Sequence, residues 1–133
     1  MTAEEMQRRY QEGEDPMDLV IEKWVRIRDC LPFAFTREDF VEILQAAQVP
    51  IPFCQEHGAR RECHRCPIHR LCQAEEEESM WSGLWRLLQA YAWAGDLLPL
   101  EPLQGAVERF VKELIDCKRE GQAGQPLRSQ RRA

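Results

Sequence analysis

Long apolar runs are absent from this sequence, and so are the motifs that mark common catalytic centres. The apolar stretches are far shorter than the roughly 20 residues that a helix needs to cross a bilayer, so we expect no membrane partner. No glycine-rich phosphate loop, nucleophile elbow or H-E-x-x-H helix occurs. The sequence therefore predicts a protein that is not an enzyme. The chain could still be an accessory subunit of an enzyme whose active site lies on another chain.

An apolar leader segment is also missing. Residues 1–15 are charged and polar and lack the apolar core of a secretory signal. The expected compartment is therefore the cytoplasm, where cysteines stay reduced. A group of cysteines in such a protein indicates a metal site before it indicates a disulfide framework.

Strand-like alternation of apolar and polar residues is absent too, whereas helical periodicity recurs along the chain. Apolar residues at three- and four-residue steps predict about four helices, which begin near Pro16, Thr36, Met80 and Pro102. Gly121 is expected to end the last of them. A capping box also favours a short polar helix over residues 3–12, but no apolar stripe supports it, and it is not counted among the four.

The composition fits one globular domain. The chain has 133 residues, of which 44% are hydrophobic and 31% charged. We expect residues 1–120 to form a single all-α domain, with a cysteine-rich metal-binding loop at residues 54–72 inserted between the second and third helices. Residues 121–133 are expected to form a flexible basic tail.

The cysteine-rich loop holds four of the six cysteines and all three histidines. The cysteines follow the pattern C-x8-C-x2-C-x5-C, at Cys54, Cys63, Cys66 and Cys72. Four thiolates suit Zn²⁺ or an iron–sulfur cluster. Structural zinc sites commonly use two paired knuckles, whereas here one C-x2-C pair is flanked by single cysteines at unequal spacing. This spacing favours a loop that wraps around a larger [4Fe–4S] cluster, and Pro67 fixes the backbone directly after Cys66.

Zinc remains the alternative metal. His57, His64 or His69 can complete a tetrahedron with three of the cysteines. The two cysteines outside the loop, Cys30 and Cys117, are expected to be small core residues near helix ends. The tryptophans either shield a cluster from water or simply pack the helices, and they are Trp24, Trp81, Trp85 and Trp93.

The cysteine spacing resembles the iron–sulfur loop of the helix–hairpin–helix DNA glycosylases, endonuclease III and adenine glycosylase. Their loop reads C-x6-C-x2-C-x5-C, so the last three cysteines match and the first gap here is two residues longer. Arg60 and Arg61 are similar to basic residues that approach DNA phosphate in that family. The chain has no glycine-rich helix–hairpin–helix turn and no catalytic Asp or Lys after one. The resemblance therefore implies the cluster but not base excision.

A second resemblance is to the WhiB-like regulators, small helical proteins with one [4Fe–4S] cluster. The segment from Cys63 to Cys72, CHRCPIHRLC, is similar to their core C-x2-C-P-V-R-x2-C. The segment MWSGL at residues 80–84 is similar to their G-[VI]-W-G-G turn. Cys54 lies closer to Cys63 than the first cysteine of that family does, and the helix over residues 102–118 has no counterpart there. This resemblance also implies a cluster rather than a particular role.

The net charge of −5 conceals a basic loop and a basic tail on an acidic body. Residues 54–72 carry four arginines against two glutamates. An acidic body argues against extensive non-specific DNA binding, but the loop and tail allow contact with nucleic-acid phosphates. The basic and imidazole side chains around the cysteines are expected to offset cluster charge or to contact a partner; they are His57, Arg60, Arg61, His64, Arg65, His69 and Arg70.

These observations predict a small, cytoplasmic, all-α iron–sulfur protein. We expect it to act without catalysis, as a redox-responsive or electron-transfer accessory protein that docks a protein partner. The alternative is a zinc-stabilised adaptor or nucleic-acid-binding regulatory module, in which the metal only stabilises the fold.

Overall fold

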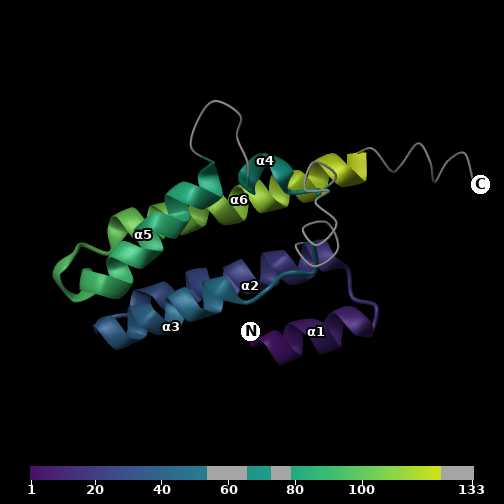
Figure 1. Cartoon of the computed structure of the whole chain (residues 1–133). Coiled ribbons are helices and arrows are strands. Elements are labelled where there is room, and N and C mark those ends of the chain that lie inside the picture. Colours follow the sequence, from purple (N-terminus) through teal and green to yellow (C-terminus); the bar gives the residue numbers. More distant parts are fainter. Residues whose placement is uncertain (54–65, 73–78, 124–133) are drawn as a thin grey trace, which may run out of the picture.

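The computed structural model describes residues 1–53, 66–72 and 79–123, and within these ranges the chain forms helices and connections without strands. The predicted all-α class is confirmed. The elements in chain order are α1 (Ala3–Gln11), α2 (Pro16–Cys30), the 3-10 turn η1 (Leu31–Phe33), α3 (Arg37–Gln48), α4 (His69–Cys72), α5 (Met80–Ala94), the 3-10 turn η4 (Gly95–Leu97) and α6 (Glu101–Ala123) (Figure 1).

The predicted count of four helices is wrong, because the described residues form six α-helices. The additional helices are α4 and α1, and α1 confirms the short polar helix that the capping box favoured, with the Thr2 hydroxyl accepting from the Glu5 amide at 3.1 Å. The cysteine-rich segment therefore follows the third helix rather than the second, and its last four residues form α4 instead of loop. Gly121 does not end α6, which continues to Ala123. Gly121 lies in open space near the exposed end of that helix, where a glycine costs the helix little.

Local capping sets the starts of α2 and α3. The Asp15 carboxylate accepts a hydrogen bond from the Met17 amide at 3.1 Å, and Pro16 follows at the first helical position. The Thr36 hydroxyl accepts from the Asp39 amide at 3.1 Å, while the Asp39 carboxylate accepts from the Thr36 amide at 3.0 Å. Backbone amides that donate to this carboxylate lower the pKa of Asp39. Both helix starts agree with the prediction from sequence.

The core lies between two layers of helices. Figure 1 shows α5 and α6 as one layer and α2 and α3 as the other, and contacts join α3 to α5 and α2 to α6 across the layers. Leu31, Leu103, Val107 and Leu114 are completely inaccessible to solvent. None of the helices among the described residues is long and apolar enough to cross a membrane.

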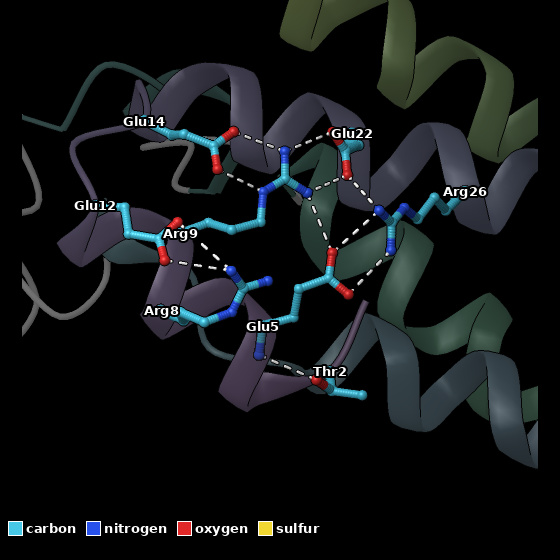
Figure 2. Close-up of polar contacts among 8 residues, drawn as sticks. All are labelled: Thr2, Glu5, Arg8, Arg9, Glu12, Glu14, Glu22 and Arg26. Atoms are coloured by element: carbon cyan, nitrogen blue, oxygen red, sulfur yellow. Dashed lines mark hydrogen bonds and ion pairs between the residues drawn. The ribbon is translucent and has the colours of Figure 1, made fainter.

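A network of ion pairs fastens α1 to α2 and explains why α1 forms without an apolar stripe. Met6 is the buried anchor of α1, at 2% exposure. Next to it, the Arg9 guanidinium on α1 donates to the Glu22 carboxylate on α2, with Nη2 2.9 Å from Oε1 (Figure 2). Arg26 of α2 contacts both Glu22, at 2.6 Å, and Glu5 of α1, at 3.0 Å. These arginines hold the pKa values of Glu5 and Glu22 below their ordinary range.

Candidate metal centre

Two of the four predicted cysteine ligands lie at the ends of a short segment that is pinned to the core. The His69 amide donates to the Cys66 carbonyl at 3.0 Å, and the Leu71 amide donates to the Ile68 carbonyl at 3.0 Å. Ile68 and Leu71 are each only 2% exposed. Cys66 and Cys72 are partly buried and pack against the edge of the same core. The fold therefore anchors the segment that carries both cysteines against the core.

The other two predicted ligands lie outside the described residues. The same is true of most of the predicted surrounding side chains, and the full set is Cys54, His57, Arg60, Arg61, Cys63, His64 and Arg65. In residues 1–53, 66–72 and 79–123, no three Cys, His, Asp or Glu side chains come together as a metal site. The four-cysteine site stays a prediction, of which two members have a described position.

The chain enters residues 54–65 from a well-anchored point. Phe53 is 5% exposed and belongs to the same core as Ile68, so the described residues on both sides of positions 54–65 are anchored in one core. Lys23 of α2 holds the preceding turn, because its ammonium donates to the carbonyls of Ala47 at 2.8 Å and Val49 at 2.9 Å. A cation at the last carbonyls of α3 also complements the helix dipole.

Sequence reasoning did not single out Lys23, although a signal was present. Val20, Trp24 and Ile27 define the buried face of α2, and position 23 falls on that face at helical spacing. A lysine is almost never fully buried unless it has polar partners. The lysine on an apolar stripe therefore indicated a buried capping contact, and it is 4% exposed in the structure.

A cavity of about 520 Å³ adjoins Cys72. Aromatic rings from α2, α5 and α6 form much of its wall. Trp24 and Trp81 have ring centroids 5.8 Å apart, as do Trp81 and Trp85. The residues that line the cavity are Val20, Lys23, Trp24, Ala47, Gln48, Val49, Pro50, Ile51, Ile68, Cys72, Trp81, Trp85 and Phe110.

The two described members of the predicted basic surround have different environments. The Nδ1 atom of His69 is buried and has no hydrogen-bond partner among the described residues. Such an atom costs about 1–3 kcal/mol unless something else satisfies it. Arg70 instead donates to Glu113 of α6 at 2.7 Å and to Glu120 at 3.2 Å. The contact with Glu113 raises the pKa of Arg70, which stays charged beside the cysteines.

The two cysteines outside the site behave differently from each other. Cys117 is 4% exposed, and burial raises the pKa of its thiol, so the prediction of a core residue is confirmed. The same prediction for Cys30 is wrong, because Cys30 is exposed. It is the last residue of α2 and falls beside, not on, the stripe that Ile27 and Leu31 continue.

The described residues define a small all-α fold in which one predicted ligand, Cys72, lines a tryptophan-walled cavity, while Cys66 packs against the same core. A scan of protein-family models and searches of curated proteins and of solved structures found no match for this chain. Function is therefore argued from the site alone.

Proposed function

We propose that this chain is a [4Fe–4S]-binding protein, with Cys54, Cys63, Cys66 and Cys72 as the ligands. The observation that carries the proposal is the C-x8-C-x2-C-x5-C spacing, two members of which the fold holds on one anchored segment. The partial burial of Cys66 and Cys72 suits a cluster that the core covers on one side and the rest of the cysteine-rich segment covers on the other. When bound, such a cluster supplies a redox centre whose potential the surrounding charges tune.

The role we propose is that of an accessory protein rather than an enzyme. Four cysteine ligands occupy the coordination positions that a catalytic metal site would keep open. We expect the basic side chains among the cysteines to offset the negative charge of the cluster, although Glu113 and Glu120 of α6 already compensate Arg70. The protein then carries electrons to a protein partner or reports the redox state of the cluster to it.

Single cysteine variants test the ligand assignment. Under anaerobic reconstitution, Cys66→Ala and Cys72→Ala are expected to lose most of the iron and acid-labile sulfide per chain. Cys30→Ala is the matched control, since Cys30 is exposed at the end of α2, and it should retain both. Circular dichroism of each variant checks that the helices remain. A Cys72→Ala protein with full iron and sulfide would remove Cys72 from the ligand set.

A second measurement separates the carrier from the sensor. An electron carrier shows a reversible couple with iron and sulfide intact in both redox states. A sensor loses its cluster on exposure to oxygen or nitric oxide and changes its affinity for the partner. An anaerobic pull-down from the native host supplies the partner for this assay.

A zinc-stabilised adaptor or nucleic-acid-binding module is the second candidate, and His69 favours it. The His69 Nδ1 atom, buried and without a hydrogen-bond partner in the described part of the chain, belongs to a residue three positions from both Cys66 and Cys72, where an imidazole can replace a cysteine as a zinc ligand. This candidate predicts one zinc and no sulfide per chain. Its nucleic-acid form also predicts retention on nucleic acid that weakens with salt and drops in Arg60→Ala and Arg61→Ala. Retention that changes neither with salt nor in the two arginine variants would count against nucleic-acid binding.

A further inference from the structure

The cavity beside Cys72 has a wall of unusual composition for a protein surface. Four of the thirteen described lining residues are large aromatics, and Trp24 packs edge-on against Phe110 with ring centroids 4.9 Å apart. Trp81 and Trp85 complete this wall from α5, and both are only partly buried. An apolar hollow that keeps two indoles partly exposed favours an occupant that excludes water from them.

The charges on the described part of the wall are compatible with a negatively charged occupant. Among the described residues that line the cavity, Lys23 is the only charged one, and it is 4% exposed. Its ammonium donates to the carbonyls of Ala47 and Val49, and none of the described lining residues is a carboxylate that would repel an anion. A cluster bound by four thiolates is negative overall, and Cys72 reaches the cavity directly.

The four tryptophans divide into two groups along α5. Trp81 and Trp85 line the cavity, as does Trp24 from α2. Trp93 is 82% exposed near the other end of α5, and twelve residues of helix place it roughly 18 Å from Trp81 along the axis. Neither interpretation from sequence, shielding or packing, applies to Trp93, whereas the other three tryptophans pack against one another at the cavity wall.

We infer that the metal centre bound through Cys72 lies with one face against this cavity, where Trp81 and Trp85 form a dry wall. This inference rests on the proposed cluster and adds its location and its protecting side chains. Trp85 acts here by excluding water, and Trp93 has no part in it.

Fluorescence of tryptophan-to-phenylalanine variants tests the location. Iron removal by a chelator should increase the tryptophan emission of the wild-type chain, because a bound cluster quenches indoles beside it. Trp93→Phe should keep this increase, while Trp81→Phe and Trp85→Phe should each lose a substantial part of it. An increase that is lost in Trp93→Phe and kept in the other two would overturn the inference.

The lifetime of the cluster in air tests the protection. Trp85→Ala should lose its visible absorbance about tenfold faster than the wild type, the lower end of what removing a supporting neighbour costs a metal site. Trp93→Ala should match the wild type. If Trp85→Ala does not fold, the comparison is made with Trp85→Phe and its fluorescence. If Trp85→Ala and the wild type both hold iron and sulfide and lose their absorbance equally fast, the protective role of the wall is refuted and the proposed cluster stands. If the wild-type chain holds no iron or sulfide, the proposed function itself is refuted.

Discussion

Replacing Lys23 by methionine is the sharpest test of how the fold holds the entrance to the site. The substitution keeps the length of the side chain and its apolar stem, and it removes the ammonium. Two charged hydrogen bonds are lost, to the carbonyls of Ala47 and Val49 at 2.8 and 2.9 Å. The Ala47 carbonyl lies in the last turn of α3 and Val49 is the C-cap of that helix, immediately before the chain runs into residues 50–53.

The expected loss follows from three opposing contributions. A hydrogen bond from a charged donor is worth about 1.5–3 kcal/mol, so two such bonds set an upper bound of about 6 kcal/mol. Methionine relieves the cost of burying an ammonium, and water reaches the partly exposed Val49 end. We therefore expect Lys23→Met to lower the free energy of unfolding by about 2–4 kcal/mol, a large share of the 5–15 kcal/mol typical of a domain.

Urea unfolding followed by circular dichroism measures this change in protein purified without oxygen. Lys112→Met is the matched control, because it makes the same chemical change at an exposed position of α6. The control should stay within about 0.5 kcal/mol of the wild type. A Lys23→Met protein as stable as the control, with an unchanged denaturant slope, would refute the capping role of Lys23.

Two further predictions concern packing and charge. Gly95→Ala should lower stability by about 1–3 kcal/mol, because its Cβ would lie 2.4 Å from Cδ2 of Phe40. A Cβ added at Gly83 would meet open space, so Gly83→Ala should raise stability by about 0.5–1 kcal/mol. The melting temperatures of Gly95→Ala and Gly83→Ala should therefore shift in opposite directions from that of the wild type. Arg9 lowers the pKa of Glu22 below its ordinary 4.5, so the stability from this pair is complete above that value. It should disappear as the pH falls through the lowered pKa of the folded state, and denaturation curves across that range should depend less on pH in Arg9→Met.

Local signals in the sequence, namely capping residues and apolar periodicity, were sufficient to predict the main helices. The capping residues Asp15 and Thr36 act within three residues of themselves, and the structure shows both in the expected hydrogen bonds. The Thr2 cap also made α1 open to prediction, but its attachment to α2 involves Arg9 and Glu22, thirteen residues apart, which only the turn between the helices brings together. Periodicity alone does not report contacts of that kind.

The candidate site also combines features that the sequence predicts with features that depend on how the helices pack. The identity and spacing of the cysteines are properties of the chain, so the ligand set was open to prediction. The tryptophan wall exists only because α2, α5 and α6 pack together, and the buried state of Lys23 depends on where α3 ends. The prediction for Cys30 failed because a single small residue at a helix end does not indicate whether it faces the core or the solvent.

The most direct test of the central claim is the metal content of the chain purified without oxygen. The account predicts a coloured protein with about four irons and four acid-labile sulfides per chain, as a [4Fe–4S] cluster requires. A colourless protein with one zinc and no sulfide would contradict the cluster and leave the zinc-stabilised module as the better description.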